Sequence, residues 1–281
     1  MFLAFVALLH ASPAAFALAP EVQQAEDQFS NGDPLGSEAT LEPYVKAHPD
    51  DPDALWRLAR ALYEKGELMS ASGKADADRL PLYAQAQTLS HHAQEVAPND
   101  GLGYLWEGVA LGRVATSKGI LSQLFTAKEI EDLWLTALTK PTSYASASGN
   151  STFPGDVYNA LGQFYRLCPD WLAMKWIAGT RGDIDKSVDY QRKLVQAEPR
   201  RIEGLKELGV SLICKGLKQN DEPSKVEGRG WLQKAEAIPP VTPVDHIDHT
   251  QIPTILAREA DACDYSRDGY EDTKESDYKT K

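Results

Sequence analysis

Mostly apolar or small residues recur at helical spacing after three prolines of this chain. Counted from Pro49, Pro98 and Pro199, they fall at the sixth, ninth, tenth and thirteenth following positions. In order, they are Leu55, Leu58, Ala59 and Leu62, then Tyr104, Glu107, Gly108 and Leu111, then Leu205, Leu208, Gly209 and Leu212. Another apolar residue stands five positions before each proline. Since positions i, i+3, i+4 and i+7 share one helix face, the pattern predicts an amphipathic helix on both sides of each proline.

A fourth stripe follows the same spacing at Tyr158, Leu161, Gly162 and Tyr165. The third member of every stripe is small, which lets a partner helix approach closely. A helix, a turn and a second helix therefore repeat along the chain, in the manner of tetratricopeptide units of about 34 residues. We predict an all-α, tetratricopeptide-type solenoid of helical hairpins, with long insertions between helices and a C-terminal capping helix.

The stripes divide the chain into five helical hairpins and one final helix. The hairpins are predicted over 20–47, 53–96, 101–139, 155–197 and 201–237, and the capping helix over 250–262. Together they make one repeat domain over 20–262. The last residues, 263–281, are polar and mixed in charge, and we expect them to form a disordered tail.

Four stretches exceed what the hairpins need, at 66–79, 116–128, 142–154 and 167–183. The last one is apolar and aromatic, and it contains Trp171, Met174 and Trp176. An apolar segment outside the repeat scaffold must pack against something. We predict that these three side chains line an apolar pocket or face a membrane, with an ordinary core position as the alternative.

The first nineteen residues contain no Lys, Arg, Asp or Glu, and 2–9 is an unbroken apolar run. Small residues at 15 and 17 fit the positions that a signal peptidase reads. We predict a signal peptide over 1–19, a mature chain that begins near Leu18, and a periplasmic or secreted protein. The alternative is a buried N-terminal helix in a cytoplasmic protein. No segment reaches the ~20 apolar residues that span a bilayer, so we expect no transmembrane segment in the mature chain.

Composition narrows the possible partners. The net charge is −12 and the pI is about 5.0, which argues against nucleic acid as a partner because its binding needs dense Lys and Arg.

The three cysteines, Cys168, Cys214 and Cys263, form no CxxC pair, and they predict neither a disulfide framework nor a zinc site. We expect buried or unpaired thiols, with a Cys168–Cys214 bridge as the alternative.

The inner helix of each hairpin lines the concave face of such a solenoid. The repeat register places ten residues there: Trp56, Arg60, Tyr63, Leu105, Val109, Arg113, Asn159, Gln163, Arg166 and Lys206. Four of them are cations in an acidic protein. Because guanidinium groups pair well with carboxylates, we interpret this face as a groove for an acidic peptide or an anionic small molecule. The alternative is that these cations pair with the chain's own Asp and Glu.

The sequence contains no catalytic motif of the GxSxG or HExxH type and no glycine-rich phosphate loop. The run 245–249 carries two histidines that can share a helix face, but the sequence places no third metal ligand. The alternative is that Asp248 or Thr250 caps the last helix. We therefore expect no enzymatic activity, no metal and no cofactor.

Several short runs together carry a family resemblance. They are LWRLARA at 55–61, LWEGVALG at 105–112, KGI at 118–120, AKEI at 127–130, GDIDKS at 182–187, WLQKA at 231–235 and PPVTP at 239–243. These runs resemble the regulator of microtubule dynamics proteins and their bacterial relatives. The relatives include the tetratricopeptide T component found with tripartite ATP-independent periplasmic transporters. The resemblance covers 20–262.

The resemblance implies an entirely helical protein without catalytic residues. The bacterial branch is periplasmic and has a hydrophobic pore or pocket for ligand passage, whereas the eukaryotic branch is tied to microtubules and organelle contacts. The predicted signal peptide favours the exported branch. We expect a binding or adaptor protein that holds a protein partner or an apolar or anionic ligand, as a periplasmic transporter accessory. The alternative is an intracellular scaffold of the microtubule-dynamics-regulator type, and the sequence leaves the oligomeric state open.

Overall fold

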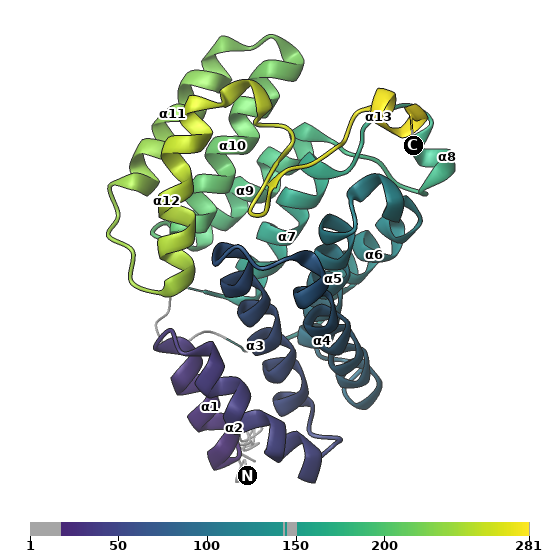
Figure 1. The fold of residues 1–281 in the computed structure, drawn as a ribbon, viewed down its shortest axis with the longest axis vertical. Helices are drawn as coiled ribbons and strands as arrows, with labels where there is room; N and C mark the ends of the chain where they lie inside the picture. Colours follow the sequence, from purple (N-terminus) through teal and green to yellow (C-terminus); the bar gives the residue numbers. More distant parts are fainter. Residues whose placement is uncertain (1–17, 143, 145–150, 281) are drawn as a thin grey trace, which may run out of the picture.

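The computed structural model describes residues 18–142, 144 and 151–280. The predicted signal peptide therefore lies almost entirely outside the described residues. Helices dominate the regular structure and pack side by side in pairs (Figure 1). Within the described ranges, no helix is both long enough and apolar enough to cross a membrane.

The elements follow the order that the hydrophobic stripes predict, with short additions in the insertions and at the C-terminus. They are α1 (Pro20–Ser30), α2 (Pro34–Ala47), α3 (Pro52–Ala71), α4 (Asp76–Val96), α5 (Gly101–Ser117), η1 (Ile120–Thr126), α6 (Ala127–Ala137), α7 (Phe153–Leu167), α8 (Met174–Ile177), α9 (Ile184–Ala197), α10 (Ile202–Gln219), α11 (Glu222–Glu236), α12 (Pro243–Ala257), η2 (Glu259–Asp261), β1 (Tyr265–Ser266), β2 (Gly269–Tyr270) and α13 (Glu275–Thr280). The hairpins are α1–α2, α3–α4, α5–α6, α7–α9 and α10–α11. The predicted all-α hairpin solenoid is thus confirmed.

Two of the small stripe residues lie where paired helices come closest. A side chain at Gly108 of α5 would meet the indole of Trp134 in α6 at 2.4 Å. At Gly209 of α10, a Cβ atom would lie 2.8 Å from the backbone oxygen of Gly228 in α11. Both separations are too short for a real side chain, so glycine is what allows each pair to pack this closely.

The last long helix begins earlier than the sequence predicts, at Pro243 rather than near 250. The Thr242 hydroxyl accepts a hydrogen bond from the Asp245 amide, and the Asp245 carboxylate accepts one from the Thr242 amide. This reciprocal capping box satisfies two amides, and Pro243 supplies a preset first turn. The prediction that Asp248 or Thr250 caps this helix is therefore wrong, and Asp248 lies buried within it.

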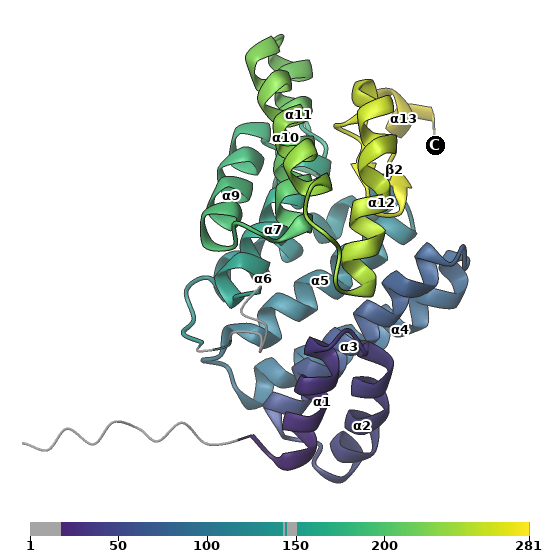
Figure 2. The same ribbon diagram turned by 90° about the vertical axis from the view of Figure 1, so that its left-hand side faces the viewer.

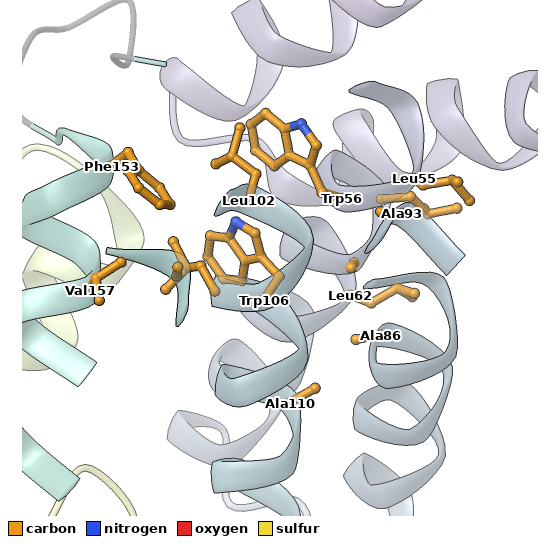
Figure 3. Packing of buried hydrophobic residues seen from close by; sticks show 14 of the residues in the cluster. Leu55, Trp56, Leu62, Ala86, Ala93, Leu102, Trp106, Ala110, Phe153 and Val157 are labelled. Carbon is orange, nitrogen blue, oxygen red and sulfur yellow. The ribbon is translucent and has the colours of Figure 1, made fainter. Parts of the chain in front are cut away.

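Two large hydrophobic clusters form the core. The first extends from α1 to α7, and Figure 3 shows side chains of α3, α4, α5 and α7 converging in it, with Trp106 of α5 on the side that faces α7. The second extends from α9 to α12 and includes Tyr265 of the β1–β2 hairpin. A third, smaller cluster joins η1 to the segment around α8. Each half of the solenoid thus has its own core.

The last helix and the hairpin close the concave side of the solenoid. Helix α12 contacts α10 and α11 and also reaches α3 in the other half (Figure 2). After it, β1 and β2 pair in antiparallel fashion around the turn formed by Arg267 and Asp268. In Figure 1 this yellow segment crosses over the helices of both halves. The prediction of a disordered tail over 263–281 therefore does not match the structure over 263–280, where the buried ion pairs of the turn hold the hairpin against the helices. Residue 281 lies outside the described residues.

A disulfide joins Cys214 of α10 to Cys263, which directly precedes the hairpin. The two residues are 49 positions apart in sequence, and their Cα atoms are 4.7 Å apart. Both sequence interpretations of Cys214 are therefore wrong, since it is neither unpaired nor bonded to Cys168. Cys168 is a buried free thiol. The disulfide fixes the base of the hairpin to α10.

Candidate functional site

A cavity of about 450 Å³ lies on the concave side of the solenoid. Its walls come from α3, α5, α6, α7, α10 and α12 and from the turn of the β1–β2 hairpin. Large apolar side chains form much of the lining, among them Leu105, Trp106, Val109, Ile130, Trp134 and Phe164. On the inner helix α5, Leu105, Val109 and Gly112 recur at helical spacing, so one face of this helix lines the cavity.

The structure brings seven of the ten predicted groove residues to this cavity. They are Arg60, Tyr63, Leu105, Val109, Arg113, Asn159 and Gln163. Trp56 instead lies in the first core cluster, where its ring packs edge-on against Tyr144. Arg166 and Lys206 are fully buried beneath the C-terminal segment. The repeat register therefore locates the cavity but does not separate its lining from the adjoining core.

The predicted apolar pocket residues lie elsewhere. Met174 is fully buried in the third cluster. The Trp171 indole packs against Tyr278 and donates a hydrogen bond to the Thr273 carbonyl at 3.1 Å. Trp176 points away from the protein and is among its most exposed side chains. None of the three lines the main cavity, and only Trp176 borders a shallow hollow on the outer surface.

The cations predicted on the inner face form ion pairs with carboxylates of the same chain. Arg60 lies 2.8 Å from Glu26 of α1, and Arg166 lies 2.6 Å from Glu207. The Lys206 ammonium lies 2.6 Å from Asp248. Because each of these pairs is almost completely buried, an anionic ligand would have to displace an internal carboxylate to reach the cation.

The turn of the hairpin inserts one charge of each sign between the two halves of the solenoid. The Arg267 guanidinium lies 3.1 Å from Glu67 in α3, 2.6 Å from Glu203 in α10 and 3.0 Å from Asp248 in α12. It also donates to the Tyr63 hydroxyl at 3.2 Å. One side chain therefore joins the first helix pairs to the last ones.

Asp268 makes the complementary contacts on the neighbouring helices. Its carboxylate lies 3.0 Å from Arg79 of α4 and 2.7 Å from Arg113 of α5. Burial raises the pKa of this carboxyl, but Arg113 and Arg79 outweigh that effect and hold it below its ordinary value. Asp268 therefore stays ionised at neutral pH and neutralises the cation that the repeat register places at 113.

Sequence reasoning missed both residues of this turn, although a signal for it exists. Asp268 and Gly269 form an Asp-Gly pair between Tyr265 and Tyr270, and Asp-Gly flanked by strand-forming residues favours a tight hairpin. The polar character of the surrounding tail conceals this signal. The charges that receive the turn come from distant helices, which the local sequence does not indicate.

Glu64 of α3 is a polar residue of the cavity lining whose carboxyl group is buried and has a raised pKa. Its Oε2 oxygen is buried and has no hydrogen-bond partner among the described residues. Burial raises the pKa of Glu64 to about 8. Arg267 opposes this rise, whereas the carboxylates of Glu67 and Glu203 add to it. Near neutral pH the carboxyl is therefore mostly protonated, and it can donate a hydrogen bond to a ligand oxygen.

The raised pKa of Glu64 makes stability depend on pH. Between its ordinary value of 4.5 and about 8, the group is protonated in the folded chain and ionised in the unfolded one. The stability that it contributes is fully present below pH 4.5, falls progressively as the pH rises from there, and is lost once the pH has risen through 8. Relative to the Glu64→Gln variant, the wild type should lose about 2 kcal/mol of unfolding free energy between about pH 6 and 7.5.

Urea unfolding of both proteins at the two pH values measures this difference. Glu42→Gln serves as the control because Glu42 is exposed on α2. Parallel pH profiles for the wild type and Glu64→Gln would contradict the protonated state of Glu64.

Comparisons with known proteins agree with the fold and with part of the family resemblance. The model of the family "Regulator of microtubule dynamics protein 1-3" matches residues 21–147. No protein of curated function matches the sequence. Human IFIT1, solved as a dimer with PPP-AAAA, superposes with a TM-score of 0.58 at 13% identity. That match covers 86% of this chain, which spans 47% of the IFIT1 chain.

A second structure is similar over most of its own length. TTC0263, a tetratricopeptide protein from Thermus thermophilus, superposes with a TM-score of 0.51 at 14% identity. The match covers 83% of this chain and 97% of TTC0263. At such low identity the similarity concerns the fold alone. The chain therefore has the tetratricopeptide-type fold, and its first part is similar to the regulators of microtubule dynamics.

Proposed function

We propose that this chain is a non-catalytic binding protein whose cavity holds an apolar or amphipathic small molecule. The observation that carries the proposal is the cavity of about 450 Å³ with its aromatic and aliphatic lining. Sites for small ligands are typically concave, mostly apolar and on the order of 300–1,000 Å³, with a few polar groups that set orientation. The protonated carboxyl of Glu64 is one such group.

The charges around the cavity favour an apolar body over a fully anionic ligand. The buried cations are already paired with carboxylates of the chain. The groove therefore offers an acidic peptide no unpaired buried cation. Arg200 differs, because it lines the cavity at an exposed position and forms no ion pair with another described residue. An acidic end group would therefore meet Arg200 at the rim, while the apolar part lies inside.

An oxidising compartment fits the disulfide between Cys214 and Cys263. Such bonds persist in periplasmic and secreted proteins and are rare in the cytosol. This supports an exported protein, and the resemblance to the T component extends the proposal to an accessory of a periplasmic transporter. The second candidate is an intracellular scaffold that binds proteins, and the family model matched over 21–147 favours it.

The two candidates differ in the N-terminus and the thiols of the natural protein. A mature chain that begins near Leu18 and has one alkylatable thiol after denaturation would support export. A chain that retains Met1 and has three free thiols would favour the intracellular scaffold. Intact-mass measurement after alkylation, on protein from its own source, decides between them.

The IFIT1 structures were solved with PPP-AAAA and m7Gppp-AAAA, but we do not extend those ligands to this chain. A phosphate chain needs several accessible cations, whereas the net charge here is −12. The inner cations Arg60, Arg113 and Lys206 are each held by carboxylates of the chain.

Filling the cavity tests the proposed ligand site. Ala160 of α7 lines the cavity, and Ala160→Phe should occupy part of its volume. We expect this variant to bind the fluorescent probe anilinonaphthalene sulfonate at least about tenfold more weakly than the wild type, a loss of ~1.4 kcal/mol. A fluorescence titration measures the affinity.

The matched control is Ala84→Phe, which adds the same ring at an exposed position of α4. The control should bind the probe as the wild type does. Equal affinity of all three proteins for the probe would place the binding elsewhere and overturn the cavity as the ligand site.

A further inference from the structure

Three large apolar side chains protrude from two insertions that the repeats do not require. Phe125 is 80% exposed, Leu172 is 83% exposed and Trp176 is 92% exposed. Phe125 belongs to η1, and the other two belong to the segment around α8. Exposing such side chains costs the folded protein favourable burial, so their position outside the core calls for an external partner.

The two insertions support each other as one piece. Leu121 and Leu124 of η1 are buried in the third hydrophobic cluster together with Met174 and Ala178. The backbone at Gly179 also approaches Lys128, since a Cβ atom there would lie 3.3 Å from that side chain. The protruding residues therefore stand on a packed base rather than on separate loops. We call the outer surface of 117–128 and 171–182 the insertion face.

The charge of the insertion face is opposite to that of the whole protein. These two stretches contain Lys118, Lys128, Lys175 and Arg181 and no Asp or Glu, in a chain of net charge −12. The carboxylates that flank the second stretch are engaged elsewhere, since Asp170 pairs with Lys218 and Asp183 caps α9. Lys128 pairs with Asp132. The other three cations form no ion pair with any residue in the described ranges. Leu172, Lys175, Trp176 and Arg181 together surround the shallow outer hollow.

We propose that the insertion face docks on a lipid bilayer that contains anionic lipids. Trp176, Leu172 and Phe125 enter the interfacial region, and Lys118, Lys175 and Arg181 contact the negatively charged headgroups. Exposed aromatic and aliphatic side chains beside Lys and Arg suit the membrane–water interface, and each cation near an anionic surface adds to the binding.

A bilayer fits these features better than a protein partner does. A protein would take up apolar anchors from one continuous patch or groove, whereas these three side chains are nearly fully exposed one by one and bury little of one another's surface. Docking on a bilayer does not require an occupied cavity, so this proposal is independent of the proposed ligand site.

Vesicle co-sedimentation tests the docking. The full chain is mixed with phosphatidylcholine vesicles, with or without one third phosphatidylglycerol. We expect the wild type to sediment with the anionic vesicles, to bind the neutral ones much more weakly and to be released by salt. Trp176→Ser should weaken partitioning at least about tenfold, and Lys175→Gln should weaken it about fivefold.

Val226→Ser is the matched control, because Val226 is an exposed apolar residue of α11, outside the insertion face. It should bind the vesicles as the wild type does, and so should Ala160→Phe, which alters only the cavity. Far-UV circular dichroism should show that every variant is folded.

Three results would overturn the proposal. One is a wild type that does not sediment with anionic vesicles. Another is equal vesicle binding by Trp176→Ser and Val226→Ser. The third is a protein that self-associates without lipid and becomes monomeric on Trp176→Ser, as judged by sedimentation velocity, which would assign the insertion face to a second copy of the chain.

Discussion

The Arg267→Met variant is expected to lose about 3 kcal/mol of unfolding free energy, the low end of the range for breaking a buried ion pair. Arg267 is the shared cation of Glu67 and Asp248, which are buried, and of Glu203, which is partly buried. Without this cation, the three carboxylates repel one another more strongly, because water screens their charges poorly there. Met keeps most of the volume of the Arg stem, so the effect reports charge rather than a cavity.

The loss should stay near the low end because each carboxylate retains another cation. Glu67 keeps Arg113 at 2.7 Å. Asp248 keeps Lys206 at 2.6 Å, and Glu203 keeps a second arginine, Arg201, at 2.7 Å. The network is therefore weakened rather than left with an isolated charge.

Urea unfolding followed by far-UV circular dichroism measures the loss. Arg192→Met provides the control, because Arg192 of α9 pairs with Glu227 of α11 on the surface, where the two side chains are 46% and 40% exposed. Exposed pairs contribute about 0–1 kcal/mol. If the two variants lost the same stability, the turn would not be a structural connection between the halves.

The hairpins of this fold can be predicted from the sequence because their cause is local. The spacing of Leu205, Leu208 and Leu212 fixes the buried face of α10. A small residue such as Gly209 in the same stripe fixes where the partner helix packs. These relationships span a few turns of one helix or one hairpin, so the sequence pattern contains them directly.

The closure of the solenoid could not be predicted in the same way. The contact between Arg267 and Glu67 joins residues 200 positions apart. Nothing in the polar segment around Arg267 specifies a distant carboxylate as its partner. The cysteines pose the same problem, since three cysteines allow three possible pairings and the one that the sequence suggested, Cys168–Cys214, is not the one that forms.

The inner cations show the limit of reading a site from a repeat register. The register places Arg113 on the concave face, and the structure agrees. It does not reveal that Asp268 returns to neutralise that charge. A cation on a predicted groove is therefore weak evidence for an anionic ligand until the charges of the rest of the chain are located.

Reduction of the Cys214–Cys263 disulfide is expected to lower the unfolding free energy by about 4 kcal/mol. The bond spans 49 positions, and it closes a loop that contains α11 and α12. Opening it restores the freedom of that loop in the unfolded chain, which favours unfolding. The Arg267 contacts lie directly beyond Cys263, so the hairpin should also exchange its amide hydrogens faster when the bond is open.

Urea unfolding with and without a phosphine reductant measures the loss, and alkylation before and after reduction counts the thiols. The Cys214→Ser, Cys263→Ser double variant is the control, because its stability should not respond to the reductant. Cys168 is a buried free thiol in both proteins, so it contributes no difference between them. An oxidised wild type that unfolds at the same urea concentration as its reduced form would show that the hairpin holds through its ion pairs alone. A response of equal size in the double variant would instead assign the effect to the reductant, so the comparison separates the covalent restraint from the charge network.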